Sequence, residues 1–218
     1  MYPGMGMRVF YPRFAVGRIA PSAMLLMDSF AYLRAPWGRE CYVQQVLEHL
    51  FFSGTIAVAV VLGGATLARG DYGRMYELAV DRFSMHLMRR VVLVSMGNDL
   101  ISSMRPMTIS MECVPDILSE LRRVRGMFAS CEAALVYGGS GSTWGYATSV
   151  LPVYDRQVNA VISEMGGIFD YVSSGVDLLK GVSPVDAIGH LDVADAFRCG
   201  HLLLSALSQL GLSRRSRL

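Results

Sequence analysis

The sequence has few charged residues, few cysteines and no long apolar run. Charged side chains make up 17% of its 218 residues, and the formal net charge is only +2. A charge this small produces no strong field that attracts phosphate, so we expect no nucleic-acid partner. The longest apolar run, Ile56–Leu62, is far shorter than the roughly 20 residues that a membrane-spanning helix needs, so we expect no membrane span.

The cysteine spacing excludes the common cysteine-based sites. The four cysteines are Cys41, Cys113, Cys131 and Cys199. They lie far apart and form no Cys-x-x-Cys pair, so neither a zinc site nor a thioredoxin-type redox motif is expected. We interpret them as small buried hydrophobic residues in a reducing compartment, which favours an intracellular, cytoplasmic protein.

What the sequence does contain is enough apolar surface for one domain of ordinary size. Hydrophobic residues make up 52% of the chain, and a chain of this length can bury a core without disulfides or metal. We place the domain at residues 22–212, between an N-terminal arm (1–21) and a basic C-terminal tail (213–218). The tail ends in Ser-Arg-Leu, which is related to the peroxisomal Ser-Lys-Leu signal and leaves a peroxisomal location open.

Short apolar segments alternate with longer segments of helical periodicity along this domain. The expected strands are Ala23–Met27, Ile56–Leu62, Val91–Val94, Ala133–Tyr137 and Ile168–Val172. The expected helices are 39–52, 72–87, 115–127, 153–165 and 192–210. This alternation predicts an α/β fold, in which a parallel, flavodoxin-like five-stranded sheet forms the middle of a three-layer α/β/α sandwich.

Polar residues follow the ends of the expected strands. In open parallel sheets, sites form beyond the carboxyl ends of the strands. The segments at this edge are Asp28-Ser29 after the first strand, Gly63-Gly64 after the second and Gly97-Asn98-Asp99 after the third, with Asp186 and His190 before the last helix. Their convergence on one edge is the main functional signal in the sequence.

These residue types match the needs of acyl transfer, which requires a nucleophile, a base and donors for an oxyanion. Ser29 is the candidate nucleophile, His190 the candidate base, and Asp186 the carboxylate that would orient it. The backbone N–H groups of Ser29 and Gly64 and the side-chain amide of Asn98 are the candidate oxyanion hole. A glycine at position 64 lets the backbone approach a substrate closely.

The order and spacing of these segments resemble the SGNH hydrolase superfamily, the GDSL-type esterases and lipases. The matching segments are Met27-Asp28-Ser29-Phe30, Leu62-Gly63-Gly64-Ala65-Thr66-Leu67, Met96-Gly97-Asn98-Asp99-Leu100 and 185–191. The resemblance covers roughly residues 22–210. It implies a serine esterase that acts on a small-molecule, lipid or carbohydrate ester through a Ser-His-Asp mechanism, without metal or organic cofactor.

Two positions depart from the family pattern. Met27 stands where the family has a glycine, and Asp186 lies four residues before His190, where the family spacing is three. Met27 lines either the acyl pocket or the core, and the alternation along its strand favours the core. With these departures, the alternative function is a catalytically degenerate SGNH-like binding or scaffolding module.

A glycine-rich loop, 138–142, resembles a phosphate-binding loop in composition. It lacks the Gly-Lys-Ser/Thr ending of a P-loop, and it contains no lysine. We therefore interpret it as a loop at the edge of the site that shapes the substrate pocket.

Overall fold

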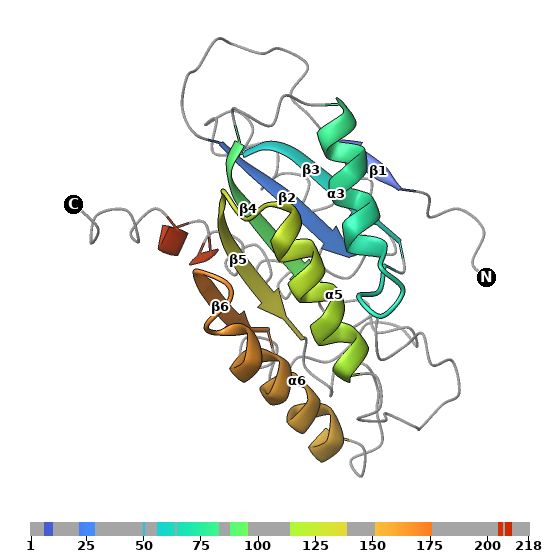
Figure 1. Ribbon diagram of the computed structural model, residues 1–218, viewed down its shortest axis with the longest axis vertical. Coiled ribbons are helices and arrows are strands. Elements are labelled where there is room, and N and C mark those ends of the chain that lie inside the picture. Colours follow the sequence, from blue (N-terminus) through green and yellow to red (C-terminus); the bar gives the residue numbers. More distant parts are fainter. Residues whose placement is uncertain are drawn as a thin grey trace, which may run out of the picture.

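A computed structural model of the protein describes ten segments of the chain (Figure 1). These are residues 7–10, 22–28, 50, 56–63, 65–82, 88–95, 114–138, 151–175, 205–206 and 208–210. Within these segments, no helix is both long enough and apolar enough to cross a membrane.

The described strands form one sheet. They are β1 (Arg8–Phe10), β2 (Ser22–Asp28), β3 (Ile56–Leu62), β4 (Met88–Ser95), β5 (Glu132–Tyr137) and β6 (Tyr171–Ser174). Their order is β1-β3-β2-β4-β5-β6, and strands β2 to β6 pair in parallel. This is the flavodoxin-like order, so the predicted five-stranded parallel sheet is confirmed.

The sheet has a sixth strand, β1, which the sequence analysis did not predict. Strand β1 lies within the expected N-terminal arm and pairs antiparallel with β3, with Arg8 opposite Val61 and Phe10 opposite Ala59. The side chain of Val9 packs against the core. The sheet therefore gains an antiparallel edge strand beside β3.

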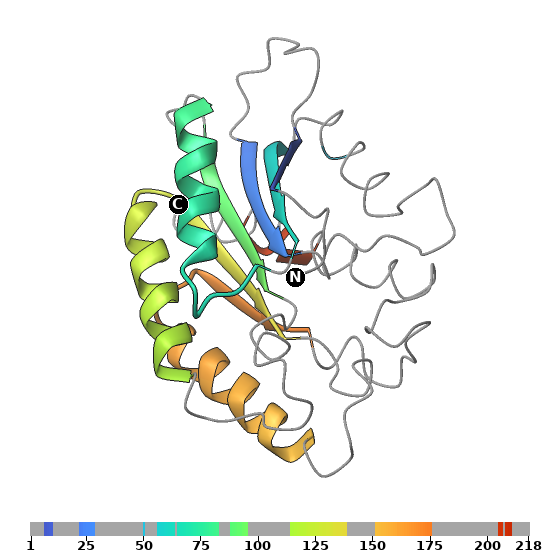
Figure 2. The same ribbon diagram turned by 90° about the vertical axis from the view of Figure 1, so that its right-hand side faces the viewer.

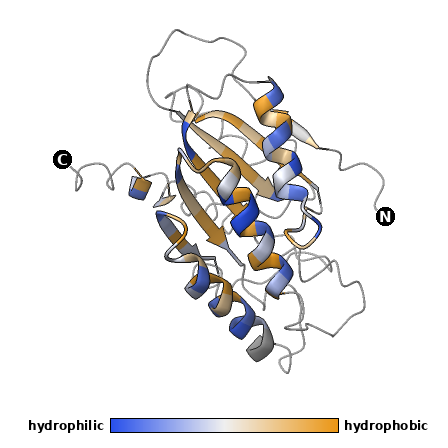
Figure 3. Cartoon of the chain, in the orientation of Figure 1, coloured by the Kyte–Doolittle hydropathy of each residue, from blue (hydrophilic) through white to orange (hydrophobic). Residues whose placement is uncertain are grey.

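Three helices cover one face of the sheet (Figure 2). They are α3 (Asp71–Arg82), α5 (Val114–Met127) and α6 (Leu151–Met165). Their apolar sides face the sheet and their polar sides face outward (Figure 3). This division is the amphipathic pattern expected of helices that pack on a sheet.

Both faces of the central strand are buried, which makes the sheet the middle layer of the sandwich. Met24 and Leu26 of β2 belong to the core cluster that includes residues of the three helices. Side chains alternate along a strand, so Leu25 and Met27 point to the opposite face, and they too are fully buried. The predicted three-layer α/β/α architecture is confirmed, and Met27 is a core residue, as the alternation indicated.

Helix α3 is held to α5 at its first turn. The N–H of Gly73 donates to Glu120 Oε1 at 3.2 Å, and the Arg123 guanidinium donates to both Glu120 oxygens at 2.7 and 2.9 Å. The first N–H groups of a helix lack partners within the helix, so a carboxylate from the neighbouring helix fills that need. A side chain at position 73 would overlap the Arg123 guanidinium, which would have to move away.

The last strand lies further along the chain than predicted. The expected strand Ile168–Val172 is wrong at its start, since the N–H groups of Ile168 and Phe169 donate to the Met165 carbonyl at 2.9 and 3.0 Å. These two residues close the end of α6 instead. Strand pairing begins at Tyr171, directly after Asp170 exchanges hydrogen bonds with the backbone of β5.

Of the other boundaries, some match the prediction and some differ by one to three residues. Helix α3 begins at Asp71 and its described part ends at Arg82, while α5 and α6 begin slightly earlier than predicted. Of the expected helices 39–52 and 192–210, only residues 50, 205–206 and 208–210 lie in the described part, and they are helical.

Candidate functional site

The carboxyl ends of β3, β2 and β4 lie side by side. Asp28, the last residue of β2, is the Cα partner of Leu62, the last residue of β3. On the other side of β2, Met27 pairs with Val94, one residue before the end of β4. Neighbouring strands are only about 4.8 Å apart, so these three ends form a continuous stretch of the sheet edge.

The predicted site residues follow these strand ends closely in the sequence. Ser29 is the next residue after β2, Gly64 comes two residues after β3, and Asn98 comes three residues after β4. Ser29, Gly64 and Asn98 themselves lie outside the described residues, as do Asp186 and His190. Their roles therefore remain predictions.

The residue before the predicted nucleophile is buried and polar. Asp28 is completely inaccessible to solvent and has an interaction partner within the protein. A buried carboxylate is tolerated only when it is hydrogen-bonded or paired, so Asp28 helps to fix the end of β2.

The ends of β4, β5 and β6 are joined by backbone hydrogen bonds. The N–H of Gly138 donates to the Ser95 carbonyl at 2.8 Å, and the N–H of Gly175 donates to the Tyr137 carbonyl at 3.1 Å. Gly138 has a φ of +80°, and a Cβ there would lie 2.8 Å from a methyl group of Val158. Gly138 thus begins the glycine-rich loop in a conformation that favours glycine.

The loop from β3 to α3 is ordered by one buried carboxylate. Asp71 Oδ2 accepts the N–H of Thr66 at 2.9 Å, and the N–H of Asp71 donates to the Thr66 carbonyl at 3.3 Å. The N–H of Ala65 donates to the Leu62 carbonyl at 3.2 Å. These bonds join Ala65 to the end of β3 and Thr66 to the start of α3.

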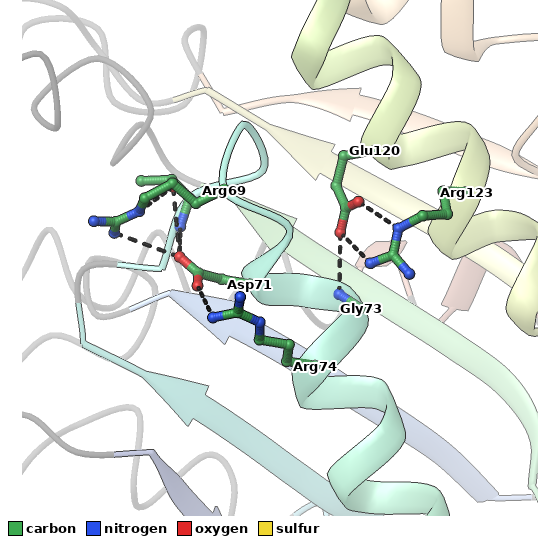
Figure 4. A network of polar contacts seen from close by, with 7 residues as sticks. Arg69, Asp71, Gly73, Arg74, Glu120 and Arg123 are labelled. Carbon is green, nitrogen blue, oxygen red and sulfur yellow. Dashed lines mark hydrogen bonds and ion pairs between the residues drawn. The ribbon is translucent and has the colours of Figure 1, made fainter.

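Two arginines from this loop and from α3 flank the same carboxylate (Figure 4). Arg69 Nη2 lies 3.4 Å from Asp71 Oδ2, and Arg74 Nη1 lies 4.0 Å from Oδ1. Together with Leu62 and Gly63, these three residues line an open hollow of about 530 Å³. The hollow therefore begins at Leu62 and Gly63, at the end of β3, and Gly64 is the next residue in the sequence.

Sequence reasoning missed this hollow. Charged residues at positions 69, 71 and 74 are visible in the sequence, but the expected helix started only at Tyr72. The signal that points to them is an acidic residue at the first helical position with arginines just before and after it. Among the described residues, no group of three His, Cys, Asp or Glu side chains could hold a metal ion.

Comparison with known proteins relates the chain to others through its structure. No protein-family model and no curated protein sequence matches it. Solved structures do match. One is a variant of an acetyl xylan esterase from Geobacillus stearothermophilus, with a TM-score of 0.57 and 15% identity over 87% of this chain and 97% of the other.

Two further solved structures match nearly the same share of this chain. A protein described as a GDSL-like lipase, from Parabacteroides merdae, has a TM-score of 0.60 and 11% identity over 87% of this chain and 97% of the other. A lipase from a goat rumen metagenome has a TM-score of 0.53 and 12% identity over 86% of this chain and 97% of the other. The protein therefore has the fold of the SGNH hydrolases, to which GDSL-type esterases and lipases belong, as its sequence pattern indicated.

Proposed function

We propose that the protein is a serine esterase that cleaves a carboxylic ester. The observation that carries the proposal is the position of three sequence segments. Ser29, Gly64 and Asn98 each follow one of three neighbouring strands, β2, β3 and β4, whose carboxyl ends share one edge. The ends of adjacent parallel strands are only one strand spacing apart. Residues that follow these ends directly can therefore meet at a shared reaction centre.

In the proposed mechanism, the Oγ of Ser29 attacks the ester carbonyl while His190 takes its proton, and Asp186 orients the imidazole. The carbonyl oxygen becomes an oxyanion that accepts hydrogen bonds from the N–H groups of Ser29 and Gly64 and from the Asn98 amide. Collapse expels the alcohol, which receives the proton from His190. A water molecule then hydrolyses the acyl-enzyme by the same route.

The fold supports ester hydrolysis as the reaction class. The similar solved structures are described as acetyl xylan esterases and lipases, proteins that act on carboxylic esters. Because acetyl and lipid esters differ in the acyl chain and share the reacting group, a p-nitrophenyl ester series from acetate to octanoate is the appropriate first assay.

The test is covalent labelling with a fluorophosphonate, which reacts with an activated serine without knowledge of the substrate. We expect the protein to be labelled at Ser29, and Ser29→Ala to lose both the label and ester hydrolysis. Asn98→Ala should keep the label site but lower kcat by roughly 10²-fold or more, with a much smaller change in KM. A folded protein that takes no label and cleaves no ester would instead be the non-catalytic binding module.

A further inference from the structure

The hollow beside β3 lies one strand spacing from the end of β2, the strand that the predicted nucleophile follows in the sequence. Leu62 lines the hollow, and its Cα partner in the neighbouring strand is Asp28, the residue immediately before Ser29. A substrate bound at the end of β2 would therefore extend into the hollow if it is longer than its reacting group. The chemistry of the hollow should then select among esters.

The described residues that line the hollow carry more positive than negative charge. They include two guanidinium groups and one carboxylate, that of Asp71, so their net charge is one positive. The Asp71 side chain is only 11% exposed, whereas those of Arg69 and Arg74 are 61% and 71% exposed. The negative charge is thus buried under the loop, and the positive charges face the open space.

The two arginines are held to different degrees. Arg69 is anchored, since its Nε donates to Thr66 Oγ1 at 2.9 Å and its Nη2 lies 3.4 Å from Asp71. Arg74 makes a looser ion pair with Asp71, at 4.0 Å, and it projects from the first turn of α3. A guanidinium carries five N–H donors, and the looser pair with Asp71 lets Arg74 turn donors toward a bound carboxylate.

We propose that Arg69 and Arg74 form a subsite for a carboxylate group of the substrate, so that the enzyme prefers esters bearing a carboxylate away from the reacting ester bond. This inference rests on the proposed esterase function. A planar carboxylate matches the fork of N–H donors on a guanidinium. The single net positive charge of the described charged residues, Arg69, Asp71 and Arg74, suits a monoanionic carboxylate better than a dianionic phosphate.

The first test compares two esters of the same acyl length. Mono-p-nitrophenyl glutarate carries a terminal carboxylate, and p-nitrophenyl valerate is its neutral counterpart. We expect the protein to have the higher kcat/KM for the glutarate ester, and Arg74→Gln to lower the glutarate-to-valerate ratio about tenfold, as the loss of one charge-assisted hydrogen bond implies. The preference should also weaken as salt rises from low to physiological concentration, because the subsite is exposed.

The matched control is Arg122→Gln. Arg122 lies on α5, is half-exposed and pairs with Glu164 at 3.0 Å, so the variant removes the same charge away from the hollow. Its glutarate-to-valerate ratio should equal that of the unchanged protein. An equal fall in both variants would mean that the effect is one of overall charge, and no fall in Arg74→Gln would overturn the subsite.

The second test measures binding without catalysis. Monomethyl glutarate is titrated by calorimetry into the Ser29→Ala variant, alone and combined with Arg74→Gln or Arg122→Gln. We expect only the Arg74→Gln combination to weaken binding, by about tenfold. Inorganic phosphate is the competing ligand, and tighter binding of phosphate than of monomethyl glutarate would overturn the carboxylate assignment.

The two tests separate this inference from the esterase proposal. Ester hydrolysis without preference for the glutarate ester, and without Arg74-dependent binding, would refute the subsite alone. Binding of monomethyl glutarate that depends on Arg74, in a protein that hydrolyses no ester, would refute the esterase proposal and leave the carboxylate site in place.

Discussion

The replacement Gly138→Ala should destabilise the protein by about 2–5 kcal/mol, because two separate costs add. The first is conformational, since φ at this position is +80° and a residue with a Cβ pays about 1–2 kcal/mol in the left-handed region. The second is steric. The new Cβ would lie 2.8 and 3.0 Å from the two methyl groups of Val158, and overpacking of this kind costs about 1–3 kcal/mol.

Val158 has little freedom to move away from the added methyl group. It is fully buried on α6, and a β-branched side chain in a helix has one strongly preferred χ1 angle. The backbone of Gly138 is equally restricted, because its N–H donates to the Ser95 carbonyl at 2.8 Å. The strain should therefore appear in the free energy of unfolding and not be relieved by a rotamer change.

Urea unfolding followed by circular dichroism measures the effect. Gly126→Ala is the control, since a Cβ at that exposed helical position would meet no atom within 4 Å, and it should stabilise the protein by about 0.5–1 kcal/mol. Val158→Ala removes the clashing methyl groups, so the double variant with Gly138→Ala should be more stable than the sum of the single effects predicts. The steric part of the reasoning would be refuted if the free-energy changes of Gly138→Ala and Val158→Ala were strictly additive in the double variant. It would also be refuted if Gly138→Ala, like Gly126→Ala, did not destabilise the protein.

Three further outcomes are expected. Met27→Gly should lower the melting temperature, because truncating a buried Met to Ala already costs about 2–5 kcal/mol, and it should give no gain on long-chain esters in the p-nitrophenyl series. Glu120→Ala should lower the free energy of unfolding by about 1–3 kcal/mol, since it leaves the N–H of Gly73 and the Arg123 guanidinium without their acceptor, and urea unfolding measures it. Burial raises the pKa of the Cys131 thiol, so at pH 8 iodoacetamide should modify Cys131 in the unfolded protein and not in the folded one, as peptide mass mapping would reveal.

The sheet could be predicted from the sequence because its central strands are continuous apolar runs. Ile56–Leu62 matches β3 at both ends, and the runs for β2, β4 and β5 fall within the observed strands. A strand buried on both faces needs apolar residues at nearly every position. Such a run can be recognised in the sequence without knowing which strands pair with it.

The two outer strands depend on tertiary contacts that the sequence does not reveal. Strand β1 has three residues, too few to show a period, and it exists through pairing with β3. Strand β6 starts late because Met165 accepts the N–H groups of Ile168 and Phe169, so two strongly apolar residues become a helix end. Apolar character alone does not distinguish these outcomes.

At the candidate site, too, some features could be predicted from the sequence and others depend on tertiary contacts. The neighbouring carboxyl ends of β3, β2 and β4 could be predicted, because sequential parallel strands bring these ends to one edge of the sheet, and the site residues beyond them stay a prediction. The hollow could not, because the positions of Arg69 and Arg74 depend on the hydrogen bonds that Asp71 makes with the loop. Arg69 lies on a turn, which has no periodicity from which the direction of its side chain could be predicted.

Strand β1 also bears on how the protein avoids aggregation. Strand β3 is an uncharged run of seven residues rich in valine, and such a strand with an open edge can pair with another molecule. The three residues of β1 occupy that edge opposite Ala59–Val61, and so short a strand offers little template for further pairing. A variant shortened to begin after Phe10 would keep the five parallel strands and its predicted site residues, but it would expose the β3 edge and should self-associate as its concentration rises.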